Sequence, residues 1–142
     1  MDFISKVTVA AAQVDELGHL NHVAAVNMLQ SARDDWYAAA ELWQGRAWSG
    51  DEVLATLVLN ININYRLECF LDDALEIITR PLQRGNKSFT LAHEIIKPDG
   101  RIAIDGSVTS LIMDMQQHQT LPLPACLARY FPARGQAGDS AV

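Results

Sequence analysis

In the stretch LVLNININYRLE (57–68), apolar and polar residues alternate strictly from Leu59 to Glu68. Successive side chains of a β-strand point to opposite faces of the sheet, so this alternation predicts a long strand with one buried face. Asn is uncommon in strands, and three of them on the opposite face indicate a wet face or a junction between subunits. The predicted buried face comprises Leu57, Leu59, Ile61, Ile63, Tyr65 and Leu67, and the opposite face comprises Val58, Asn60, Asn62, Asn64, Arg66 and Glu68.

A long helix is predicted before this strand. Apolar residues recur at steps of three and four from about His22 to Trp43, which is typical of a helix with one apolar face. The glycines of QGRAWSGDE (44–52) are expected to end this helix. Other strands are predicted at 3–12, 74–82, 88–97 and 101–115, with turns at RGNK (84–87) and PDGR (98–101) and a short helix within LPLPACLARYF (121–131).

The order of these elements predicts an α+β domain. One amphipathic helix must bury its apolar face, and an antiparallel sheet is the apolar surface that the chain offers for it. We therefore expect a curved sheet around one central helix, in a single domain over 1–132. The composition of ARGQAGDSAV (133–142) predicts a disordered tail. The sheet edges and outer face still need cover, so a homo-oligomer is expected.

Composition excludes several classes of protein. The net charge of -6 and the scattered basic residues argue against nucleic acid as a partner. The N-terminus lacks the layout of a signal peptide, and no apolar segment is long enough to span a bilayer. Cys69 and Cys126 show no metal spacing and fit small core residues in a reducing cytoplasm. The four histidines show no metal-ligand spacing, so no metal is predicted.

The stretch VDELGHLNH (14–22) admits two interpretations. In the first, DELG is a type I turn and Asn21 caps the helix that begins near His22, and local sequence alone favours this plain interpretation. In the second, Asp15 delivers a carboxylate to a helix N-terminus, where free N–H groups can hold the oxygen of a polarised carbonyl. Gly18 would let the backbone approach a ligand closely. That combination suits acyl transfer from a thioester.

A resemblance favours the second interpretation. The stretch looks like the signature of the hotdog-fold acyl-CoA thioesterases related to 4-hydroxybenzoyl-CoA thioesterase. The match runs without a gap through Asp15, Gly18, His19-Leu20-Asn21-His22, Ser31-Ala32-Arg33 and Trp36. Looser matches are LDDALEI (71–77), GNKSFTLAHEI (85–95) and LPLP (121–124), so that the resemblance covers nearly the whole chain. It implies the hotdog fold, with dimers that pair into tetramers.

The resemblance also implies roles for single residues. Asp15 matches the catalytic carboxylate, which is a nucleophile or a general base depending on the family member. His22 matches the residue at the helix start whose backbone N–H polarises the thioester carbonyl, and Gly18 matches the glycine of the turn. The family often has Asn at the position of His22 and Tyr at the position of Ala25, so this chain departs from the common pattern twice. The predicted substrate-binding residues are His19, Asn21, Asn62 and Asn64.

The predicted function is hydrolysis of an acyl or aroyl thioester of coenzyme A or of acyl carrier protein. No organic cofactor is needed, because coenzyme A enters only as part of the substrate. One alternative is a non-catalytic protein that binds acyl-CoA. A less favoured alternative is a hotdog dehydratase or hydratase, whose Asp-x-Asn-Pro-x-His motif is absent here. His19 is expected to hold the turn, and His93 to be a hydrogen-bonded, partly buried residue.

Overall fold

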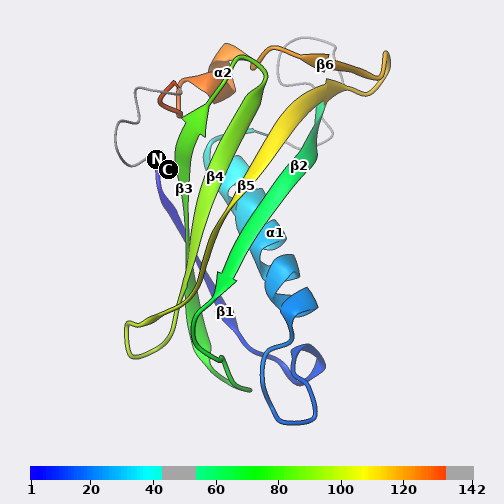
Figure 1. Cartoon of the computed structure of the whole chain (residues 1–142). Coiled ribbons are helices and arrows are strands. Elements are labelled where there is room, and N and C mark those ends of the chain that lie inside the picture. The colour runs from blue at the N-terminus through cyan, green and yellow to red at the C-terminus, as the bar shows by residue number, and fades with distance from the viewer. Residues whose placement is uncertain (43–53, 134–142) are drawn as a thin grey trace.

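A computed structural model describes residues 1–42 and 54–133 of the chain (Figure 1). Residues 134–142 of the predicted tail (133–142) and the predicted helix break at 44–52 therefore lie outside the described residues. In chain order the elements are β1 (Phe3–Thr8), the 3-10 turn η1 (Ala11–Gln13), α1 (His22–Ala39), β2 (Leu54–Tyr65), β3 (Ala74–Arg84), β4 (Ser88–Ile96), β5 (Ile102–Asp114), β6 (Gln119–Leu121) and α2 (Ala125–Ala128).

The strands form one antiparallel sheet of six strands. Its order is β1-β3-β4-β5-β2, and the short β6 pairs with the far end of β5. The sheet is strongly twisted and curves along α1, which lies against one of its faces (Figure 1). This is the predicted α+β architecture of the hotdog fold. Within the described residues, no helix is both long enough and apolar enough to cross a membrane.

Helix α1 begins where the sequence predicts. Asn21 is its N-cap and accepts a hydrogen bond from the backbone N–H of Ala24 at 2.8 Å. The helix ends at Ala39, earlier than predicted, because Glu41 takes a left-handed backbone conformation with φ 62°. Its buried face joins two parts of the core: Val9, Leu29, Ile77 and Ile95 near the N-terminal half, and Trp36, Phe89, Leu127 and Phe131 near the C-terminal half.

Strand β2 departs from the predicted alternation at a β-bulge. The register between β2 and β5 shifts between Val58 and Asn60, with Leu59 in the bulge. One inserted residue reverses which side chains face each side of a sheet. Val58 therefore shares the helix side with Ile61 and Ile63, whereas Leu57 lies on the outer side. The prediction that Leu57 belongs to the same face as Ile61 is wrong.

The sequence also predicts that the face of β2 with Ile61 and Tyr65 is buried, and within one subunit this prediction is wrong. Ile61 is 44% exposed and Tyr65 is 53% exposed. The reason is that β2 ends the strand order, so the described part of the chain places no further strand beyond it. The asparagines of the opposite face are exposed, as expected of a wet face.

A polar cluster lies between α1 and the sheet. The guanidinium of Arg33 donates to Nε2 of His93 at 3.3 Å, so the Nδ1–H of the imidazole donates to the hydroxyl of Thr79 at 3.0 Å. All three residues are buried. Burial, and to a lesser extent the charge of Arg33, lower the pKa of His93 to about 3. The prediction of a hydrogen-bonded histidine is confirmed, and burial is more complete than predicted.

His93 should make the folded state sensitive to acid. The unfolded chain binds a proton at His93 below a pKa of about 6.5, whereas the folded chain binds it only near pH 3. Stability should therefore fall as the pH drops from 6.5 towards 3, by up to about tenfold in the unfolding equilibrium constant per pH unit. Urea unfolding between pH 4.5 and 7.5 measures this slope, and His93→Gln should reduce it. The exposed His118 gives the control, His118→Gln; an equal reduction in both variants would contradict the assignment.

Candidate active site

The turn that begins at Asp15 has the predicted geometry. The N–H of Gly18 donates to the backbone carbonyl of Asp15 at 3.0 Å, and the N–H of Asp15 donates to the carbonyl of His19 at 2.8 Å. Gly18 has φ 80°, a left-handed conformation in which a side chain would be strained. The plain interpretation of DELG as a turn is therefore confirmed, and it is compatible with a site built on that turn.

The carboxylate of Asp15 is oriented by this turn. Its Oδ1 accepts hydrogen bonds from the backbone N–H groups of Leu17 at 2.9 Å and of His19 at 3.0 Å. These donors, the His19 N–H foremost, hold the pKa of Asp15 below its ordinary value. Its Oδ2 has no hydrogen-bond partner among residues 1–42 and 54–133. Asp15 therefore presents an ionised, oriented carboxylate with one oxygen available to a ligand.

The N-terminus of α1 supplies hydrogen-bond donors beside this carboxylate. The cap occupies two N–H groups, since Asn21 accepts from Ala24 through its side chain and from Ala25 through its carbonyl. The N–H groups of His22 and Val23 find no acceptor within the described part of the chain. Free donors at a helix N-terminus, together with the helix dipole, favour an oxygen that carries negative charge.

Asp15 and His22 line the same cavity, whose volume is about 540 Å³. One wall comes from the turn and the start of α1, and the other from the end of β2 and the residues that follow it. Apolar side chains from Leu20, Leu67 and Ile104 mix with the polar groups. Such a mixture is typical of small-molecule sites. The lining consists of Asp15, His19, Leu20, Asn21, His22, Tyr65, Arg66, Leu67, Glu68, Cys69 and Ile104.

The structure brings most of the predicted site residues together. Asp15, His19, Asn21 and His22 line the cavity, and Gly18 lies in the turn beside them. His19 holds the turn through its backbone, and its Nδ1 lies 3.3 Å from a carboxylate oxygen of Glu68.

Asn62 and Asn64 are not brought to this cavity within the subunit. Both lie on the outer face of the sheet, where Asn64 donates to Asp105 at 3.1 Å. Their contact with a substrate stays a prediction. Ala25, where the family often has Tyr, is buried in the core and does not line the cavity.

Sequence reasoning missed the wall formed by Tyr65–Cys69. These residues lie at and beyond the end of β2, and no local pattern marks them as part of a site. Their position depends on contacts distant in sequence, such as the N–H groups of Arg66 and Leu67, which both donate to the carbonyl of Ala103. Within the described ranges, no group of three or more His, Cys, Asp or Glu side chains has the arrangement of a metal site.

Comparisons with known proteins identify the family of the chain. A curved antiparallel sheet around a central helix defines a hotdog protein, and in this one Asp15 shares a cavity with the start of that helix. The chain belongs to the thioesterase-like superfamily, whose model matches residues 9–131. This membership confirms the predicted family and places the chain among thioester hydrolases.

Three similar proteins illustrate the match. The long-chain acyl-CoA thioesterase FadM of Escherichia coli (strain K12) is 29% identical over 120 residues, which cover 84% of this chain and 89% of that protein. A 1,4-dihydroxy-2-naphthoyl-CoA thioesterase from Synechocystis has a TM-score of 0.76 at 16% identity, covering 89% of this chain and 92% of the other. A Staphylococcus aureus protein solved in complex with CoA has a TM-score of 0.78 at 15% identity, covering 93% and 87%.

Proposed function

We propose that the chain hydrolyses acyl or aroyl thioesters of coenzyme A at the cavity between Asp15 and the N-terminus of α1. The observation that carries this proposal is the pairing of two groups in one cavity. Asp15 offers a free carboxylate oxygen, and His22 offers a free backbone N–H. The E. coli relative named as a long-chain acyl-CoA thioesterase and the S. aureus structure in complex with CoA support coenzyme A as the carrier of the acyl group.

The chemistry follows from these two groups. The N–H groups of His22 and Val23 would donate to the thioester carbonyl oxygen and stabilise the negative charge that develops on it. Oδ2 of Asp15 would attack the carbonyl carbon and expel the coenzyme A thiolate, and water would then hydrolyse the resulting anhydride. In the other route, Asp15 takes a proton from a water molecule, which attacks the same carbon and expels the same thiolate. Neither route needs an organic cofactor or a metal.

Gly18, His19 and Asn21 would orient the reacting groups rather than react themselves. Gly18 keeps the turn free of a side chain, and His19 orients Asp15 through its backbone N–H. Asn21 fixes the start of α1 and thereby the direction of the free N–H groups. Asn62 and Asn64 would reach a substrate only from a neighbouring subunit, because their own subunit places them on the outer face of the sheet.

The test is release of free thiol from a panel of short, long and aromatic acyl-CoAs by the wild type and by Asp15→Asn. Turnover by the wild type that collapses in Asp15→Asn supports the proposal, and the preferred acyl group identifies the substrate class. Tight binding of acyl-CoA without turnover would instead support the non-catalytic alternative. Turnover only of acyl carrier protein thioesters would move the substrate from coenzyme A to a carrier protein.

We also propose that subunits pair through the open edge of β2. Among the described residues, no strand pairs with the backbone groups along this edge. On the side of β2 that faces the helix, Val58, Ile61 and Tyr65 are 39%, 44% and 53% exposed to solvent. An exposed apolar edge strand is a site of association. Sedimentation velocity should show a dimer or a dimer of dimers for the wild type and a smaller species for Ile61→Lys. Ile4→Lys, on the opposite edge strand β1, is the control; an unchanged mass in Ile61→Lys would exclude this edge.

The proposed compartment is the cytoplasm. The sequence has two cysteines, Cys69 and Cys126, without a recognisable disulfide or metal spacing, and this usage fits a reducing environment.

A further inference from the structure

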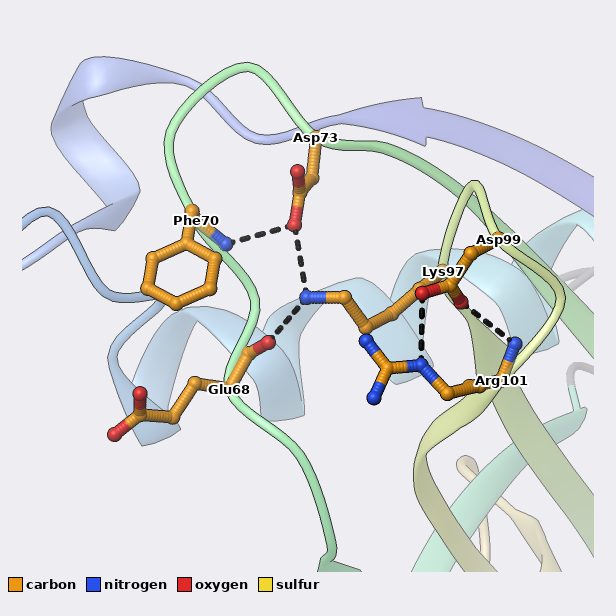
Figure 2. Close-up of polar contacts among 6 residues, drawn as sticks. All are labelled: Glu68, Phe70, Asp73, Lys97, Asp99 and Arg101. Atoms are coloured by element: carbon orange, nitrogen blue, oxygen red, sulfur yellow. Dashed lines mark hydrogen bonds and ion pairs between the residues drawn. The ribbon is translucent and has the colours of Figure 1, made fainter.

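The amine of Lys97 lies in a nearly closed site behind the cavity wall. Its side chain is only 9% exposed, and Lys is rarely so buried unless its charge is paired. Nζ donates to the backbone carbonyl of Glu68, and to Oδ2 of Asp73 at 3.2 Å. It also lies 4.9 Å from the centre of the Phe70 ring. Figure 2 shows the amine between these groups, all of which belong to the segment that joins β2 to β3.

These contacts fix both ends of one short segment. Lys97 holds Glu68 at its start and Asp73 at its end, and Oδ2 of Asp73 also accepts from the N–H of Phe70 at 2.9 Å (Figure 2). We call residues 68–73 the wall segment. The amine of Lys97 thus holds the carbonyl of Glu68 and the carboxylate of Asp73, and that carboxylate in turn holds the N–H of Phe70.

The wall segment in turn holds the turn that carries Asp15. The carbonyl of Cys69 accepts from the N–H of Leu20 at 2.8 Å, and the N–H of Leu71 donates to the carbonyl of Gly18 at 3.1 Å. His19 and Phe70 form a β-bridge, and their rings meet edge to face at 5.0 Å. The position of the turn therefore depends on the wall segment, whose ends are held by Lys97.

We propose that Lys97 is a positioning residue, which holds the wall segment so that Cys69 and Leu71 keep the Asp15 turn in register with the N-terminus of α1. It touches no reacting atom. Its effect on catalysis rests on the proposed function, whereas its effect on the turn does not. A nearby pair provides a contrast: Arg101 donates to Asp99 at 2.7 Å in the exposed turn between β4 and β5 (Figure 2). Among the described residues, no hydrogen bond or ion pair joins Arg101 or Asp99 to the wall segment.

The test compares Lys97→Met with the control Arg101→Met. Each variant removes one cation and one ion pair, but only the first releases the wall segment. Hydrogen exchange of the Leu20 and Leu71 amides should be faster by about tenfold or more in Lys97→Met, because their hydrogen bonds join the wall segment to the turn. Exchange in α1 and β4 should be unchanged. Arg101→Met should leave both amides as in the wild type, and Lys97→Arg, which keeps a donor, should restore most of their protection.

The effect of Lys97 on catalysis is measured separately, by steady-state kinetics. Because a small displacement of a catalytic group is costly, Lys97→Met should lower kcat between about tenfold and a hundredfold with little change in KM. The acid limb of its pH profile should move to higher pH, since the His19 N–H is the main group that lowers the pKa of Asp15. If Lys97→Met destabilised the whole fold, hydrogen exchange would also be faster in α1 and β4. Asp73→Asn is a milder variant for the same exchange measurement.

Two results would overturn the inference. One is that the amides of Leu20 and Leu71 exchange hydrogen at the same rate in Lys97→Met as in the wild type. The other is an equal change in Arg101→Met. A wild type that turns over no thioester would overturn the proposed function instead, and the exchange measurement would still decide whether Lys97 positions the turn.

Discussion

Asp15→Asn should lower kcat/KM for the preferred acyl-CoA by about a thousandfold, the range of a lost general base or nucleophile. The amide keeps an oxygen that can accept from the N–H groups of Leu17 and His19, so the turn should keep its shape. What is lost is the negative charge and the basic oxygen at the cavity. The expected pattern is therefore a loss in kcat with acyl-CoA binding largely retained, measured by thiol release and by equilibrium binding.

Glu16 provides the matched control for this substitution. Its carboxylate is exposed and lies next in sequence to Asp15, but it does not line the cavity. Glu16→Gln removes the same charge from the same turn and should leave kcat/KM within about twofold, as is usual for exposed sites. If Asp15→Asn turned over acyl-CoA at the wild-type rate, Asp15 would have no part in the mechanism.

The pH dependence supplies a second readout on Asp15. Its pKa is lowered by backbone hydrogen bonds, the His19 N–H foremost, so the carboxylate stays ionised at pH values where an ordinary aspartate begins to protonate. Activity that depends on ionised Asp15 is lost only as the pH falls through this lowered pKa. An acid limb centred well above the ordinary pKa of about 3.9 would indicate that another group controls the rate.

The active-site turn could be predicted because its determinants are local. A type I turn favours Asp and Gly at the spacing of Asp15 and Gly18, and a helix N-cap favours a residue such as Asn21. Both signals lie within a few residues of the groups that they position. The same short stretch also carried the family signature, so fold and candidate nucleophile were predicted together.

The opposite wall of the cavity could not be predicted, since its determinants are distant in sequence. Lys97 reads as the polar end of a strand, and nothing near it in the sequence indicates that its amine holds Glu68 and Asp73. The β-bulge at Leu59 is a further case. It follows from the register between β2 and β5, whereas the apolar run Leu57-Val58-Leu59 does not show which residue is inserted.

Gly106→Ala should destabilise the fold more than any surface substitution, because β2 leaves no room for a β-carbon at Gly106. It pairs with Ile63 of β2 and with His93 of β4. A β-carbon there would collide with the backbone carbonyl of Asn62 and with the Cα of Ile63. Backbone atoms cannot rotate away, so β2 would have to separate from β5. We expect a loss of about 3 kcal/mol in the free energy of unfolding, the upper range for overpacking.

The loss should extend to the active site, because β2 leads directly into the cavity wall at Tyr65 and Arg66. Urea unfolding measures the stability, and thiol release at low temperature measures the activity of the folded fraction. Gly85→Ala is the matched control: its β-carbon would meet only the hydroxyl of Ser88, 3.1 Å away, and that side chain can rotate. Its expected effect is within about 0.5 kcal/mol. Equal stability of the two variants would show that β2 shifts freely along β5, and the close approach at Gly106 would then have no structural role.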